Sequence, residues 1–262
     1  MKRITKVKTL EDGRALLNVG CGTRTHCEWN NIDRSPYARL VHHMSLARFL
    51  RRVGILSPKR YENLRFTDLQ IICWDVRQGL PFDDNAFDAV YHSHFLGHID
   101  RVQVPYIMSE CHRVLKNGGT IRIVVPDLEQ LVRRYCDATA ALRLGERGAA
   151  EDYEETVFDI FELMVRRAPE GTSEQPPLVR MLERVVRGDT MDQGEARRWH
   201  YDEYSLSRLL QEAGFGEIQR VDAVTSRIEG WARFALDINE DGTVYKPCSL
   251  YMEAVKQPTA RR

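Results

Sequence analysis

The feature that most constrains this chain is a short apolar run that leads directly into a glycine turn. Residues 15–19 are apolar except for Asn18, and Gly20-Cys21-Gly22 follows without a spacer. A short apolar run bounded by turn residues is typical of a buried strand. Glycines at such a turn let the backbone approach a ligand closely, although a sharp strand-to-helix turn also uses them for geometry alone.

Two later strands end in acidic residues. The predicted strands cover residues 29–33 and 69–75, and their last residues are Asp33 and Asp75. A carboxylate at the tip of the second strand can accept hydrogen bonds from both hydroxyls of a ribose. A strand-end acid is also a common helix cap or turn former. Because two acids fall where a nucleotide-binding pattern expects them, we favour a ligand role.

Strands and helices alternate along the rest of the chain. A fourth strand is predicted over 87–93, a helix over 104–115 that stops at Asn117-Gly118-Gly119, and a fifth strand over 120–125. Near the end, a helix over 202–213 precedes two strands, which suit an antiparallel edge hairpin. This order predicts an α/β fold: a Rossmann-like, doubly wound, mostly parallel seven-stranded sheet with helices on both faces.

Two insertions interrupt this pattern, so we expect the Rossmann-like domain to comprise residues 1–126 and 200–257. Residues 34–66 form a basic amphipathic helical insertion, with seven Lys or Arg and no acid between Arg34 and Arg60. Residues 127–199 form a helical insert that includes helices over 153–165 and 178–186, and we expect it to act as a lid.

Composition and charge restrict the partners. The 262 residues are 43% hydrophobic, and Lys plus Arg and Asp plus Glu each number 38, so the chain has no general attraction for nucleic acid. We expect a soluble, cytoplasmic protein, because no stretch is long enough to span a membrane and the start has no signal-peptide apolar region. The six dispersed cysteines are expected to be reduced thiols.

Several motifs occur in a characteristic order: Leu17-Asn18-Val19-Gly20-Cys21-Gly22, Asp33, Asp75-Val76, Gly79-Leu80-Pro81-Phe82 with Phe87-Asp88, and Arg113-Val114-Leu115-Lys116-Asn117-Gly118-Gly119. In this order and spacing the chain resembles the class I S-adenosylmethionine-dependent methyltransferases. More narrowly, segments 90–96, 124–129, 198–202 and 246–254 resemble the bacterial type-11 methyltransferases associated with polysaccharide and glycosyl-transfer pathways.

The resemblance implies S-adenosylmethionine as the cofactor and assigns roles around it. The glycine loop would hold the methionine part, Asp33 the ribose, and Asp75 with Val76 the adenine, while His92 and Ser93 would face the methionine end. The complete set of expected cofactor-binding residues is Asn18, Gly20, Cys21, Gly22, Asp33, Asp75, Val76, His92 and Ser93.

The chain departs from the family pattern in three places. Arg24 stands where many members have a third glycine, and Gly97 stands where a Glu is common. Only ten residues separate Gly22 from Asp33. The usual first helix must therefore be nearly absent.

Methyl transfer requires an acceptor atom held in line behind the methyl group, and a hydroxyl acceptor also benefits from a base. The candidate catalytic residues are His94, His98, Asp127, His200 and Tyr201, and we favour His94 because it directly follows the fourth strand. A purely structural role for these histidines is about as well supported. A metal site is disfavoured, because no carboxylate or cysteine completes a set of ligands with His92, His94 and His98.

These observations predict methyl transfer to a small molecule, with oxygen of a saccharide or related hydroxyl-bearing acceptor, such as a sugar phosphate, favoured. Two alternatives stay open: an NAD(P)-dependent oxidoreductase and a non-catalytic S-adenosylmethionine-binding protein. The oxidoreductase is disfavoured because Thr25 stands where the dinucleotide-binding motif G-x-G-x-x-G has its third glycine. Residues 39–60 form a solvated basic face or contact an anionic substrate or membrane surface. The helical insert and the edge hairpin are also candidate surfaces for a homodimer.

Overall fold

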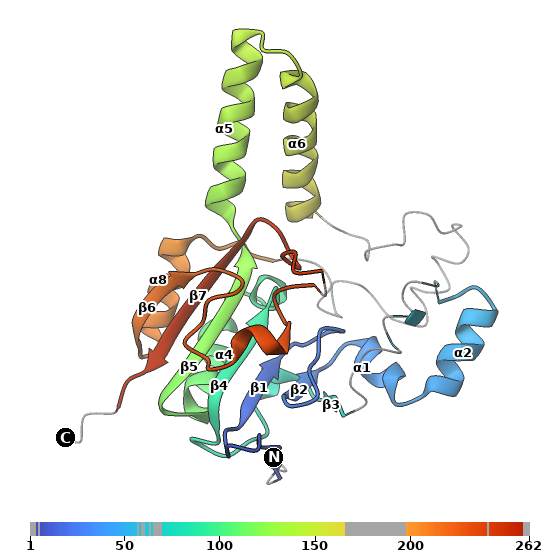
Figure 1. Ribbon diagram of the computed structural model, residues 1–262, viewed down its shortest axis with the longest axis vertical. Coiled ribbons are helices and arrows are strands. Elements are labelled where there is room, and N and C mark those ends of the chain that lie inside the picture. Colours follow the sequence, from blue (N-terminus) through green and yellow to red (C-terminus); the bar gives the residue numbers. More distant parts are fainter. Residues whose placement is uncertain are drawn as a thin grey trace.

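A computed structural model describes residues 4, 6–56, 58, 61, 62, 64, 70–165, 198–239 and 241–258. A seven-stranded sheet forms its centre, with the strand order β3-β2-β1-β4-β5-β7-β6 (Figure 1). The strands are β1 (Leu16–Val19), β2 (Asn30–Asp33), β3 (Ile72–Cys73), β4 (Phe87–Ser93), β5 (Leu115–Pro126), β6 (Phe215–Val221) and β7 (Ser249–Lys256).

The strands β1 to β5 are parallel to one another, and β7 is antiparallel to both β5 and β6. The predicted fold class, with its antiparallel edge hairpin, is therefore confirmed. Because β1 lies between β2 and β4, the turn after β1 meets the ends of both at one edge of the sheet.

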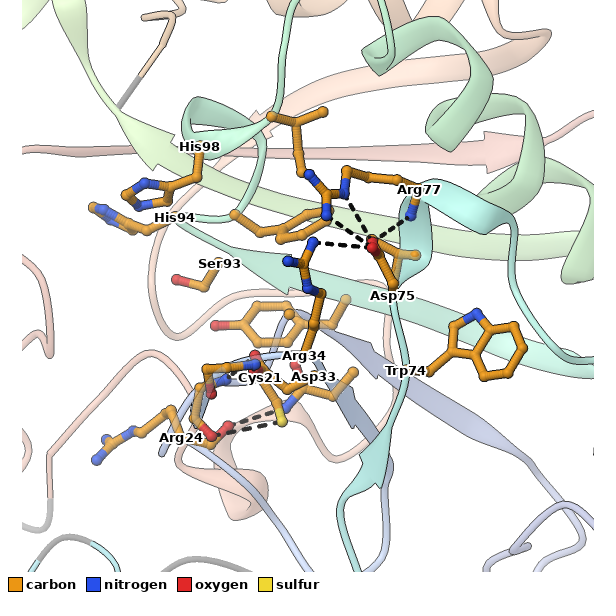
Figure 2. Close-up of a pocket in the computed structure, with 18 of the residues that line it drawn as sticks. Cys21, Arg24, Asp33, Arg34, Trp74, Asp75, Arg77, Ser93, His94 and His98 are labelled. Carbon is orange, nitrogen blue, oxygen red and sulfur yellow. Dashed lines mark hydrogen bonds and ion pairs between the residues drawn. The ribbon is translucent and has the colours of Figure 1, made fainter. Parts of the chain in front are cut away.

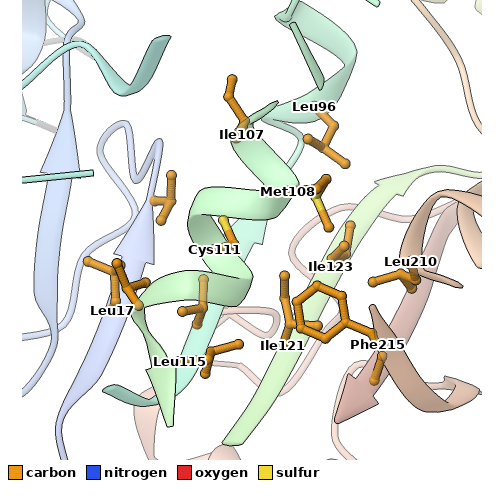
Figure 3. Packing of buried hydrophobic residues seen from close by; sticks show 14 of the residues in the cluster. Leu17, Leu96, Ile107, Met108, Cys111, Leu115, Ile121, Ile123, Leu210 and Phe215 are labelled. Carbon is orange, nitrogen blue, oxygen red and sulfur yellow. The ribbon is translucent and has the colours of Figure 1, made fainter. Parts of the chain in front are cut away.

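Two helices cover one face of the sheet. They are α4 (Val104–Val114) and α8 (Glu203–Glu212), and α8 begins with a capping box between Asp202 and Ser205. The apolar residues of α4 pack on alternate residues of the central strands, such as Ile121 and Ile123 of β5 (Figure 3).

The opposite face is covered by an irregular segment, residues 222–248, which joins β6 to β7. Its short helix η3 (Trp231–Phe234) packs with Trp29 and with Tyr91 of β4 in a second apolar cluster. No helix forms in residues 20–29, between β1 and β2, as the short spacing there predicted. The segment 222–248 thus buries sheet surface beside the place where a first helix would otherwise lie.

A buried charged cluster attaches this segment to the sheet. The Arg122 guanidinium of β5 donates to Asp237 and to Glu253, each at 2.9 Å, and to the carbonyl oxygens of Thr225 and Asp222. Tyr91 donates its hydroxyl to Asp237 at 2.6 Å. Since buried charges persist only when they are paired, this cluster fixes where the segment lies.

Some elements differ from the prediction. The third strand is only two residues long, because it lies at the sheet edge and the chain turns at Asp75 into the short helix η1 (Val76–Gln78). The predicted stop at Asn117-Gly118-Gly119 is wrong: α4 ends at Val114, and residues 116–119 bulge out of β5, where Phe87 pairs with Leu115 and Ala89 with Thr120.

The described residues of the two insertions are mostly helical. The basic segment forms two helices, α1 (Pro36–Val41) and α2 (Met44–Arg52), which are separated at His42 and His43. In the second insertion, α5 (Leu128–Leu144) and α6 (Ala149–Val165) form an antiparallel pair that projects from the sheet (Figure 1). The predicted helix over 153–165 falls within α6, and the one over 178–186 lies outside the described residues. The lid role stays a prediction.

Within the described part of the chain, no helix has the length and apolar character needed to cross a membrane.

Candidate functional site

A cavity of about 320 Å³ opens at the edge of the sheet where β1, β2, β3 and β4 end (Figure 2). Its size lies at the lower end of the range for small-molecule sites. Ten predicted site residues line it: Asn18, Gly20, Cys21, Gly22, Asp33, Asp75, Val76, Ser93, His94 and His98. The structure therefore brings together most of the residues that the sequence had placed at one site.

The glycine loop is shaped by two left-handed residues. Gly20 has φ +64° and Gly22 has φ +54°. A Cβ atom on Gly20 would lie 2.3 Å from Cδ2 of Phe95, whereas a Cβ on Gly22 would meet nothing within 4 Å. Gly20 is thus required for close packing as well as for its backbone conformation.

The Asp33 carboxylate holds this loop in place. Its Oδ2 accepts a hydrogen bond of 2.8 Å from the Gly22 backbone N–H, and its Oδ1 accepts one from the Ser35 N–H. The residue is only 8% exposed but lines the cavity. An ionised carboxylate has about four lone-pair sites, two on each oxygen. Because one site on each oxygen is occupied, each oxygen can accept one more hydrogen bond from a ligand hydroxyl.

Asp75 has two arginine partners that the sequence analysis did not foresee. Arg34 donates to Asp75 Oδ2 at 2.9 Å, and Arg77 donates to both carboxylate oxygens, at 2.9 and 2.8 Å (Figure 2). Burial raises the pKa of the Asp75 carboxyl, and the positive charge of Arg34 opposes that shift. A ligand base at this end of the cavity would therefore meet guanidinium groups as well as the carboxylate.

Arg24, which replaces the third glycine, connects the glycine loop to segment 222–248. Its guanidinium donates to the carbonyl oxygens of Leu236 and Ile238 and lies over the Tyr245 ring, 4.2 Å from the centroid. These contacts place Tyr245 and Lys246 in the cavity wall. Arg24 thus has a structural role that a glycine could not fill.

Gly97, where a Glu was expected from the family pattern, allows another chain segment to cross closely. The backbone N–H groups of Arg198 and Trp199 both donate to the Gly97 carbonyl oxygen, at 2.6 and 3.2 Å. A Cβ atom on Gly97 would lie 3.1 Å from the Trp199 carbonyl oxygen. This crossing brings Arg198 to the cavity, where it pairs with Asp100 at 3.3 Å.

His94 lies at the end of β4 with φ +51°, a conformation that is uncommon for residues other than glycine. Its Nε2 lies 2.9 Å from the hydroxyl oxygen of Ser249. Ser249 in turn donates to the Lys246 carbonyl oxygen at 2.9 Å. Strained backbone supported by such contacts is a common feature of functional sites. His98, in the short helix η2 (Leu96–His98), lies near His94 in the same cavity wall (Figure 2).

Four predicted site residues lie outside the lining of the cavity. His92 is fully buried in β4, and burial lowers its pKa to about 3. Asp127 caps α5 and pairs with Arg220 at 2.9 Å. Tyr201 belongs to the apolar core, and burial raises its pKa to about 12. His200 follows the crossing at Trp199 but does not line the cavity.

Several lining residues were missed by sequence reasoning. They include Arg34, Arg77, Tyr91, Gln103, Tyr245 and Lys246. Arg34 and Arg77 each lie close in sequence to a predicted acid, and this proximity was a usable signal. Tyr245 and Lys246 carried no periodic signal, because segment 222–248 is mostly irregular.

The residues present fit an adenosine-bearing cofactor with a methionine tail. Gly20 and Gly22 line the cavity, and no other atom lies within 4 Å of where a Cβ on Gly22 would be, so a ligand can approach the loop closely there; Asp33 offers acceptors to ribose hydroxyls. Asp75 and Val76 line the same cavity.

Comparison with known proteins identifies the domain. Residues 17–123 match the type-11 family model described as "Methyltransferase domain". The matched range runs from β1 to β5 and includes the glycine loop, Asp33, Asp75 and His94. No curated protein matches the chain in sequence.

Several solved structures resemble the chain distantly. One is a possible histamine N-methyltransferase from Thermotoga maritima, with a TM-score of 0.43, 14% identity, and coverage of 93% of this chain and 83% of that chain. Another is the Haloferax volcanii complex of the Trm112 activator with a putative methyltransferase (TM-score 0.42, 13% identity, 97% and 86% coverage). A third is the YcgJ protein from Bacillus subtilis (0.42, 13%, 94% and 92%).

The chain thus carries a methyltransferase domain over residues 17–123, and the protein is an S-adenosylmethionine-dependent methyltransferase.

Proposed function

We propose that the protein methylates an oxygen atom of a small hydroxyl-bearing acceptor, such as a saccharide or sugar phosphate, and that His94 is the general base. The observation that carries this proposal is the position of His94, which lines the same cavity as the glycine loop and Asp33. An imidazole takes up a proton near neutral pH, as the loss of the hydroxyl proton requires.

Cofactor binding is assigned to the residues around the glycine loop. Gly20, Cys21 and Gly22 would hold the methionine part, Asp33 the ribose, and Asp75 with Val76 the adenine. The bound cofactor supplies an electrophilic methyl group on a sulfonium. Asn18 donates to the Arg24 carbonyl oxygen and to the Asn31 side chain, so it would shape the loop more than contact the ligand.

The cavity wall near His94 supports an acceptor with negative charge or many hydroxyls. Lys246 and Arg198 reach this wall from segments outside the matched range 17–123. Cationic groups of this kind recognise phosphate and carboxylate oxygens. A sugar phosphate combines a hydroxyl to be methylated with an anionic group that these residues could bind.

The cofactor assignment is tested by calorimetric titration with S-adenosylmethionine, S-adenosylhomocysteine and NAD. We expect both sulfur compounds to bind and NAD not to bind. Binding of NAD alone would refute the assignment. Asp33→Ala is expected to weaken binding, whereas exposed Asp241→Ala serves as a matched control.

The acceptor is identified by screening sugar phosphates, free saccharides, amines and carboxylic acids for release of S-adenosylhomocysteine. Two-dimensional NMR of the product then assigns the methylated atom. His94→Ala should lower turnover by about 10²-fold or more while cofactor affinity stays unchanged. His98→Ala, a change in the same wall, is the comparison. A wild-type rate for His94→Ala, or a methyl group on nitrogen or carbon, would contradict the proposal.

A further inference from the structure

Helix α2 carries two apolar stripes on different sides. Met44, Ala47 and Leu50 pack into a small cluster with Val41 and the residues after the helix, including Leu56. A second stripe contains Leu46, Phe49 and Val53, which are 49%, 59% and 48% exposed. Their spacing of three and four residues places them on one face. We call these three residues the outer stripe.

The remaining face of α2 is basic. Arg48, Arg51 and Arg52 are exposed and, with 3.6 residues per turn, fall on the side of the helix away from the outer stripe. The sequence from Arg34 to Tyr61 contains no Asp or Glu. A helix with large apolar residues on one face and arginines on the other has the pattern of helices that lie in a membrane interface.

The chemistry of this surface favours one partner. Nucleic acid would use the arginines but would leave Leu46, Phe49 and Val53 in water. An anionic lipid surface satisfies both, because the acyl boundary accepts the apolar side chains and the headgroups attract the basic ones. The overall charge of the chain is balanced, so the attraction must come from this local surface.

We infer that α2 docks the protein on the surface of an anionic membrane. Helix α2 lies beside the β2 and β3 edge of the sheet, away from the projecting pair α5 and α6 (Figure 1). Helix α1, which precedes α2, begins two residues after Arg34, and Arg34 lines the cavity. Docking through α2 therefore brings the cavity close to the lipid surface.

The test is sedimentation of the full chain with vesicles of phosphatidylcholine alone or mixed with phosphatidylglycerol. We expect binding to the mixed vesicles, weaker binding at high salt, and little binding to phosphatidylcholine. The variant Leu46→Ser/Phe49→Ser/Val53→Ser should bind the mixed vesicles about tenfold more weakly or worse. The matched control is Val102→Ser/Leu144→Ser, which removes two exposed apolar residues elsewhere and should bind like the wild type.

A second variant separates charge from apolar insertion. Arg48→Gln/Arg51→Gln/Arg52→Gln should lose affinity for the mixed vesicles by about tenfold or more and lose the salt dependence. Circular dichroism and affinity for S-adenosylhomocysteine should be unchanged in each variant, which separates this inference from the proposed function. Equal binding of the wild type and the serine variant to mixed vesicles would overturn it. The inference would also be overturned if the wild type did not bind vesicles. One such outcome is that the outer stripe mediates a dimer, which the serine variant would abolish.

Discussion

The Nε2 atom of His94 and the hydroxyl oxygen of Ser249 lie 2.9 Å apart, and this contact defines which nitrogen of His94 is basic. A serine hydroxyl has a single proton, and Ser249 donates it to the Lys246 carbonyl oxygen. Ser249 must therefore accept from His94, so Nε2 carries the proton in the neutral ring. Nδ1 is then the nitrogen that carries the lone pair.

This relationship predicts the effect of removing the hydroxyl. Ser249→Ala should lower methyl transfer by about tenfold, because the imidazole loses the contact that sets its tautomer and orientation. Ser249→Thr keeps a hydroxyl and should retain most of the activity. Nitrogen-15 NMR of the His94 ring reports the tautomer and does not require the methyl acceptor to be known or present. An unchanged tautomer together with an unchanged rate in Ser249→Ala would contradict this role.

The two glycines of the loop should differ in their tolerance of alanine. Gly22→Ala is expected to lower the free energy of unfolding by about 1 kcal/mol, the cost of a left-handed alanine in open space. Gly20→Ala should cost about 3 kcal/mol, because its Cβ also collides with Phe95. Urea unfolding measures both. In a double-mutant cycle, Phe95→Leu should relieve part of the Gly20→Ala cost, and strict additivity would exclude the collision as its cause.

Local sequence signals predicted the strands and the glycine loop well. The apolar run before Gly20 and the acidic ends at Asp33 and Asp75 are patterns within a few residues, and the parallel sheet brings them to one cavity. Strand order follows from this alternation, because parallel connections have few alternatives. The fold class and most of the cofactor side of the cavity could therefore be read from the sequence.

The other wall of the cavity could not be predicted in this way. Segment 222–248 has no helical or strand periodicity over most of its length, and its position depends on contacts distant in sequence. Arg24 meets carbonyl oxygens more than 200 residues away, and Arg122 meets Asp237 across 115 residues. The role of Gly97 likewise depends on a crossing at Trp199. Residue type alone does not disclose such pairs.

Removing Arg122 from its buried cluster should destabilise the fold strongly. Arg122→Met leaves the carboxylates of Asp237 and Glu253 buried without their partner, so the free energy of unfolding should fall by about 3–5 kcal/mol. The control is Arg133→Met, which breaks an exposed pair with Glu129 and should leave the free energy of unfolding close to that of the wild type. If Arg122→Met and Arg133→Met lowered the free energy of unfolding equally in urea, the buried cluster would contribute no more to stability than the exposed pair.

Asp33 should be sensitive even to an isosteric change. In Asp33→Asn, one carboxylate oxygen becomes an NH₂ group and faces the backbone N–H of Gly22 or of Ser35. The loop then loses a charge-assisted hydrogen bond, and a ribose would lose an acceptor. Affinity for S-adenosylhomocysteine should fall by about 10- to 100-fold in calorimetry. Retention of wild-type affinity would remove Asp33 from the cofactor site.

The buried His92 should make stability dependent on pH. Burial lowers its pKa from the usual 6.5 to about 3, and its ring nitrogens have no hydrogen-bond partner in the described part of the chain. Between pH 6.5 and 3 the unfolded chain therefore binds a proton at His92 that the folded protein does not. The unfolded state is favoured as the pH falls, by about 2 kcal/mol at pH 5.

His92→Leu removes this proton uptake, and the other titrating groups remain common to both proteins. The loss of unfolding free energy between pH 7 and pH 5, measured with urea, should therefore be about 2 kcal/mol smaller in His92→Leu than in the wild type. The exposed His43→Gln is the control and should lose as much stability as the wild type. If His92→Leu loses as much as well, the His92 ring takes up its proton in the folded state and is not the desolvated group described here.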